Sequence, residues 1–162
     1  MRILGIDPGY HRCGFAVIES SGRSVQLTGS GTIETKRGEA LAVRLHALAL
    51  ELEQLLTEWQ PDWLAVEEIY FTKNVKTAIG VAQARGVVLE RSAAAGVPVA
   101  EYTPTTVKSQ LTGSGQADKQ QVAFMVARHV SLDGDKRLDD ELDAIAVALC
   151  HSMRASIPEE LR

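Results

Sequence analysis

Residues 1–20, MRILGIDPGYHRCGFAVIES, decide the fold and raise its first chemical question. Residues 2–7 form an apolar strand that ends in Asp7, and Pro8-Gly9 follows at once. Residues 12–19 predict a second strand, residues 24–34 predict a third, and residues 20–22 predict the hairpin turn between them. A carboxylate at the end of an apolar strand is either a turn residue or part of a site at the edge of the sheet.

The rest of the chain predicts helices that alternate with two further strands. Leucines recur at steps of three and four over residues 41–59, which is typical of an amphipathic helix, and Pro61 ends it. WLAVE at residues 63–67 predicts a strand covered on both faces, and residues 97–100 predict a fifth strand. Helices are expected over 75–95, 104–112, 118–130 and 139–153.

This order predicts an α/β fold with a five-stranded mixed sheet, in which three antiparallel strands precede two parallel ones and helices cover both faces. At 162 residues the chain fits a single domain, 1–162, with about eight residues at the end as a frayed tail.

Composition excludes several classes of protein. The 45% hydrophobic and 23% charged residues are ordinary for a soluble globular protein, and no apolar run is long enough to span a bilayer. No secretory signal precedes Asp7, so Cys13 and Cys150 are expected to be reduced thiols of a cytoplasmic protein. The net charge is −4, but residues 71–130 hold seven basic and three acidic side chains between two acidic ends. Random surface scatter explains this distribution as well as a cationic face does.

Three groups of carboxylates lie at the ends of strands or helices that are otherwise apolar. Asp7 ends the first strand, Glu67-Glu68 end the fourth, and Asp140 and Asp143 stand at the start of the last helix. Solvated strand ends, turns and helix caps are the alternatives. Asp140 and Asp143 share a helix face because they are three residues apart, and a crossover would make the first and fourth strands neighbours. The carboxylates would then converge.

Buried, unpaired carboxylates are strongly unfavourable, and a divalent cation removes the conflict. Oxygen ligands favour Mg²⁺ or Mn²⁺ over Zn²⁺, and two such ions form a clamp for phosphoryl displacement. The four histidines are scattered and predict no competing nucleophile or ligand set.

Four stretches, in this order, resemble the RuvC family of crossover (Holliday) junction endodeoxyribonucleases, whose fold is RNase H-like: GIDPG with GFAVIE, AVEEIYFTKNVKTAIGVAQARG, YTPTTVKSQLTGSGQADKQQV and DDELDAIAVALCH. The resemblance runs from residue 2 to about residue 153. It implies Asp7, Glu67, Asp140 and Asp143 as catalytic metal ligands, with Mg²⁺ or Mn²⁺, two ions per site. Asp139 is the rival of Asp140, and Glu68 is the neighbour of Glu67. Glu141 departs from the small residue expected between the two aspartates.

The resemblance also implies catalytic lysines and DNA-contacting residues. Lys108 and Lys119 match lysines placed near the scissile phosphate, although each is also a plausible surface lysine. Tyr70 or Phe71 would wedge into the opened junction, and a basic track would bind phosphates. Its members are Lys73, Lys76 and Arg85.

The implied function is symmetric resolution of four-way junctions in DNA recombination and repair by a homodimer, with RuvA and RuvB as partners and no membrane. Three alternatives remain at this point. An actin-like ATPase shares the Gly-Ile-Asp-x-Gly hairpin, a catalytically dead module would bind junctions without cutting, and another RNase H-like nuclease would act on hybrids or duplex DNA.

Overall fold

In the computed structural model the described residues are 1–22, 24–69, 75–132 and 137–155. The predicted order of elements is confirmed. The strands are β1 (Arg2–Asp7), β2 (Arg12–Ser21), β3 (Ser24–Glu34), β4 (Trp63–Glu67) and β5 (Val99–Tyr102). The helices are α1 (Leu41–Trp59), α2 (Val75–Ala94), α3 (Pro104–Thr112), α4 (Lys119–His129) and α5 (Asp139–Ala155).

The strands form one mixed sheet in the order β3-β2-β1-β4-β5. β1, β2 and β3 pair antiparallel, whereas β1–β4 and β4–β5 pair in parallel. The predicted fold class is therefore confirmed, and the first and fourth strands are neighbours, as the convergence of their carboxylates requires.

Several element boundaries differ from the prediction by one or two residues, including those of β2 and β5. β2 continues to Ser21, which pairs with Ser24, so the hairpin turn is shorter than residues 20–22. β5 begins at Val99 rather than at residue 97. Pro98 has no N–H to donate, and its carbonyl instead accepts a 2.9 Å hydrogen bond from the Leu64 N–H as the strand begins. Residues 156–162 of the predicted tail lie outside the described residues.

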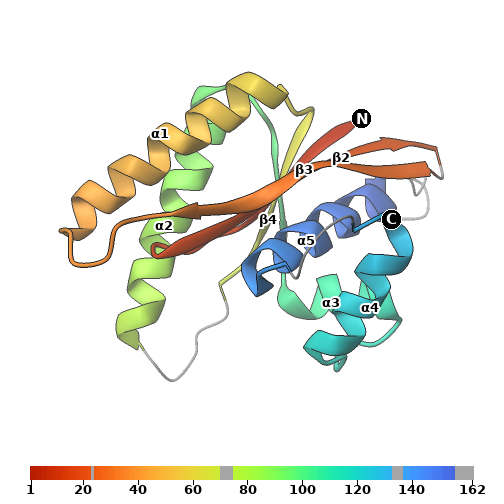
Figure 1. Ribbon diagram of the computed structural model, residues 1–162. Helices are drawn as coiled ribbons and strands as arrows, with labels where there is room; N and C mark the ends of the chain where they lie inside the picture. The colour runs from red at the N-terminus through yellow and green to blue at the C-terminus, as the bar shows by residue number, and fades with distance from the viewer. Residues whose placement is uncertain (23, 70–74, 133–136, 156–162) are drawn as a thin grey trace.

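Helices cover both faces of the sheet (Figure 1). α1 and α2 pack on one face, against a cluster that includes Leu4 and Ile6 of β1. α3, α4 and α5 pack on the other face, against residues that include Ile3 and Ala65. Because side chains alternate along a strand, Asp7 and Glu67 share the face of Ile3 and Ala65, which is the α5 face. No helix in the described part of the chain is both long and apolar enough to cross a membrane.

Two glycines let α5 lie directly on the sheet. A Cβ at Gly5 of β1 would overlap the carbonyl of Ala144, and a Cβ at Gly14 of β2 would overlap the carbonyl of Asp140. Gly14 pairs with Asp7 across the β1–β2 ladder. The glycine at position 14 therefore sets how closely the first turn of α5 approaches the end of β1.

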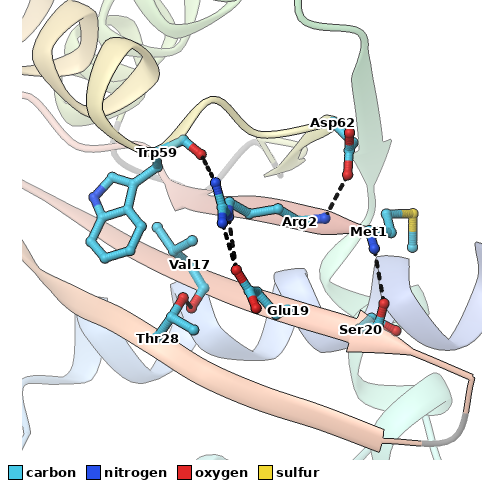
Figure 2. Close-up of polar contacts among 8 residues, drawn as sticks. All are labelled: Met1, Arg2, Val17, Glu19, Ser20, Thr28, Trp59 and Asp62. Atoms are coloured by element: carbon cyan, nitrogen blue, oxygen red, sulfur yellow. Dashed lines mark hydrogen bonds and ion pairs between the residues drawn. The ribbon is translucent and has the colours of Figure 1, made fainter.

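Polar contacts fasten the opposite end of β1 (Figure 2). The Arg2 guanidinium donates to Glu19 at 2.6 Å and to the Trp59 carbonyl at 2.6 Å, and its backbone N–H donates to Asp62 at 2.7 Å. The amino group of Met1 donates to the carbonyl of Ser20 at 2.9 Å. These contacts join β1 to β2 and to the end of α1, so β1 is held at the end remote from Asp7.

Replacing Gly14 with alanine is expected to lower the free energy of unfolding by about 1–3 kcal/mol, because the new methyl group overlaps the α5 backbone. Urea unfolding measures the effect. Gly86→Ala in α2 is the matched control, since a Cβ there meets open space and alanine favours a helix. Equal stability of the two variants would contradict the close-packing account.

Candidate active site

Asp7 and Glu67 stand side by side at one edge of the sheet. Ile6 and Val66 are in register across the parallel β1–β4 pair, so the residues that follow them end neighbouring strands. Both carboxylates line a cavity of about 280 Å³ whose other walls come from the loop after each strand, from α2 and from Pro104 at the start of α3. Strand pairing thus delivers two of the predicted carboxylates to one cavity.

The first turns of α5 bring two more carboxylates to this edge. The Asp140 side chain is 25% exposed, and the Asp143 side chain lies one turn further along the helix. Burial raises the pKa of Asp7 to about 7, and the charges of Asp143, Glu67 and Asp140 raise it as well. Three elements therefore contribute carboxylates whose charges act on one another.

Glu67 and Asp143 are affected in the same way. Burial raises the pKa of Glu67 to about 7, and the charge of Asp143 adds to the rise. Burial also raises the pKa of Asp143, while nearby Lys119 opposes that rise. Protons thus bind this cluster near neutral pH when no other cation compensates its charge.

Cationic side chains offset part of the negative charge. Lys119 Nζ lies 3.4 Å from Asp143 Oδ2 and 3.7 Å from Asp139 Oδ2. Arg12 Nε of β2 lies 2.9 Å from Asp140 Oδ2. Lys108 of α3 is near enough for its charge to lower the pKa of Glu67. Lys119 thus lies beside the predicted carboxylates, and Lys108 lies within electrostatic range of Glu67.

The donor set suits a hard divalent cation. Its four members are carboxylates, and Asp140 Oδ2 is buried without a hydrogen-bond partner in the described structure. Within the described ranges, no three His, Cys, Asp or Glu side chains are grouped closely enough to hold an ion as they stand. Side-chain rotation would have to gather the oxygens. The residues present fit a metal ion by chemistry and charge, and Asp7, Glu67, Asp140 and Asp143 would hold it.

The two rival carboxylates have different surroundings. The Asp139 side chain is 74% exposed and reaches Lys119, and its charge is not among those that shift the pKa of Asp7. Glu68 is exposed, although it also lines the cavity with Glu67. The geometry favours Asp140 and Glu67 as the members of the cluster.

Glu141, the departure noted between the two aspartates, is buried and forms an ion pair with Arg137. Arg137 also donates a 2.5 Å hydrogen bond to Ser30 of β3. Glu141 therefore points toward β3 and helps to fasten the start of α5 to the sheet, on the side away from β4 and Glu67.

Most of the predicted DNA-contacting residues cannot be placed. Tyr70, Phe71 and Lys73 lie outside the described residues, as does the side chain of Lys76 in α2. Arg85 is described: it pairs with Glu101 of β5 and is 19% exposed, so its charge is already compensated within the protein. A role for these residues in binding DNA stays a prediction.

Sequence reasoning did not single out the buried Arg44 of α1, which fixes the loop after Asp7. Its Nε donates to Thr35 Oγ1 at 2.9 Å, and its Nη2 contacts the Tyr10 carbonyl and His11 Nδ1. The Tyr10 ring packs on Gly80 of α2, where a Cβ would lie 2.6 Å from the ring. A lone arginine on the apolar side of a helix was the available signal.

Comparison with known proteins places this geometry in a family. A model of the crossover junction endodeoxyribonuclease RuvC matches residues 3–151. The chain is 48% identical over 151 residues to the crossover junction endodeoxyribonuclease RuvC of Syntrophomonas wolfei, covering 93% of this chain and 88% of that protein.

Solved structures agree with the sequence comparison. The chain superposes on Thermus thermophilus RuvC in complex with Holliday junction substrate with a TM-score of 0.90 at 33% identity, covering 96% and 95% of the two chains. The yeast mitochondrial Holliday junction resolvase Ydc2 shares the fold, with a TM-score of 0.69 at 14% identity over 96% of this chain and 81% of that one. The predicted RNase H-like fold and family are both confirmed: the chain belongs to the RuvC family of crossover junction endodeoxyribonucleases.

Proposed function

We propose that the protein is a structure-selective endonuclease that resolves four-way DNA junctions by nicking opposing strands symmetrically. The observation that carries the proposal is the carboxylate cluster of Asp7, Glu67, Asp140 and Asp143, assembled from three elements at one edge of the sheet. The Holliday junction bound by the similar T. thermophilus RuvC supports the choice of substrate.

Membership of the RuvC family implies a divalent metal ion. We infer Mg²⁺, with Mn²⁺ as a substitute, and two ions in each site, held by the same four carboxylates. When bound, the ions would activate a water molecule and stabilise the leaving oxygen of the phosphodiester. The carboxylates must be ionised for this role, and pKa values near 7 for Asp7 and Glu67 make ion binding compete with protons.

The lysines supply positive charge to the reacting phosphate. Lys119 is the first residue of α4 and follows the Asp118 cap, where the helix dipole disfavours a cation. Asp143 and Asp139 compensate the positive charge of Lys119, and a bound phosphate would compensate it in the same way. Lys108 lies on the neighbouring helix α3 with its charge near Glu67. Both lysines would stabilise charge that develops on the phosphate oxygens.

Symmetric cutting requires two sites, so we infer a homodimer, with Tyr70 or Phe71 as the wedge at the junction centre. Lys73, Lys76 and Arg85 remain predicted phosphate contacts. RuvA and RuvB remain predicted partners, in recombination and repair in the cytoplasm.

The direct test is incubation with a mobile junction, an immobile junction and linear duplex, with and without Mg²⁺. Paired nicks only in junctions and only with Mg²⁺ are expected. Asp7→Asn is expected to lower the cleavage rate at least about 100-fold while junction binding persists, because the charge is lost but the shape is kept. Asp62→Asn, at the opposite end of the sheet, is the control. Binding without cleavage by the unaltered protein would instead favour a non-catalytic module.

Lys119→Ala is expected to slow single-turnover cleavage about 10²-fold, with a smaller effect on junction affinity, because its charge acts mainly on the transition state. Lys36→Ala, which removes an exposed lysine paired only with Glu39 among the described residues, is the control. A cleavage rate equal to that of the control would show that Lys119 is a surface lysine without a role in catalysis.

The metal-free protein is expected to lose stability as the pH rises from about 4 to about 7. Asp7 and Glu67 bind protons more tightly in the folded state than in the unfolded state, so the folded state holds more protons in this range. Urea unfolding in a chelating buffer measures the slope, and Asp7→Asn should make it shallower. A stability that rises over this range in the unaltered protein would contradict the shared burial of these carboxylates.

A further inference from the structure

Arg12 is the first residue of β2 and faces the same side of the sheet as Gly14, two residues further along. That side faces α5, whose first turn lies against Gly14. The Arg12 guanidinium is therefore held beside the start of α5, with Nε 2.9 Å from Asp140 Oδ2. Unlike Lys119, it approaches the cluster from the sheet.

The Arg12–Asp140 contact is ionic rather than an aligned hydrogen bond. Asp140 Oδ2 is buried and lacks a hydrogen-bond partner in the part of the chain that the structure describes, although Arg12 lies within ion-pair distance. The Arg12 side chain is 42% exposed, so it can move into solvent without unfolding the strand. Such a pair is weak enough to be displaced.

We propose that Arg12 is the resident counter-ion of Asp140 and competes with the divalent cation for this carboxylate. The inference rests on the proposed role of Asp140 as a metal ligand. A cation that binds Asp140 must either displace the guanidinium or tolerate its repulsion. Arg12 thereby raises the metal concentration at which the site fills, and it acts as a positioning residue rather than a catalytic one.

Lys119 does not serve the same purpose. Its Nζ lies between Asp143 and Asp139, at 3.4 and 3.7 Å, and leaves Asp140 to Arg12. The two cations thus occupy different carboxylates of the same helix, and only Arg12 is paired with the less exposed aspartate of the Asp139–Asp140 pair.

The test is calorimetric titration of the DNA-free protein with Mn²⁺ at pH 8, above the pKa values of Asp7 and Glu67. Arg12→Gln is expected to bind Mn²⁺ about threefold more tightly than the unaltered protein, and the difference should shrink as the salt concentration rises. Arg12→Lys should return the affinity toward that of the unaltered protein. Arg91→Gln removes an equally charged residue from exposed ion pairs in the last turn of α2 and should change nothing.

Measuring Arg12→Gln in a protein that also carries Asp140→Asn distinguishes the counter-ion role of Arg12 from the role of Asp140 as a metal ligand. Asp140→Asn alone should weaken Mn²⁺ binding, and adding Arg12→Gln to it should bring no further change, because the competed carboxylate is gone. If Arg12→Gln alone leaves the affinity unchanged or lowers it, the counter-ion role is wrong while the metal site stands. If Asp140→Asn leaves the affinity unchanged, the proposed metal site itself fails at this residue.

Discussion

The close contact between α5 and the glycines of β1 and β2 is the constraint on which the site depends. Asp7 and Glu67 are placed by the sheet alone, because β1 and β4 pair in parallel and end together. Asp140 and Asp143 reach the same edge only because Gly5 and Gly14 leave no side chain between the helix and the strands. A helix held further out by side chains at these positions would carry its aspartates away from the strand ends.

That contact creates an electrostatic conflict that the protein resolves only in part. Burial and like charges raise the pKa values of Asp7 and Glu67 to about 7, which marks the arrangement as unfavourable in the absence of cations. A structure selected only for stability has no reason to keep such a cluster, and perturbed carboxylates of this kind concentrate at functional sites. The Arg137–Glu141 pair, in which Glu141 is buried, helps to keep the start of α5 on the sheet despite this repulsion.

Much of this could be read from the sequence, for physical reasons that particular residues illustrate. The period-two and period-3.6 patterns predict every element, and the apolar run before Glu67 predicts a strand buried next to β1. β5 lies two residues further along the chain than the predicted 97–100, because the local pattern there does not reveal the register that β4 imposes on Val99–Tyr102. Arg12 carried no local signal of its role, and the lone Arg44 on the apolar side of its helix did not indicate its partners, since both residues acquire their partners from elements distant in the sequence.

The positions of Lys119 and Arg12 determine how tightly the carboxylates of the cluster are paired with the protein's own cations. Lys119 begins a helix, where the dipole disfavours its charge, and its contacts with Asp143 and Asp139 compensate that charge. Arg12 approaches Asp140 from a strand and lacks the alignment of a strong hydrogen bond. Both cations thus stabilise the carboxylates without binding them tightly. Under the proposed function, counter-ions of this kind suit the site, because a tightly paired carboxylate would be closed to metal ions and DNA.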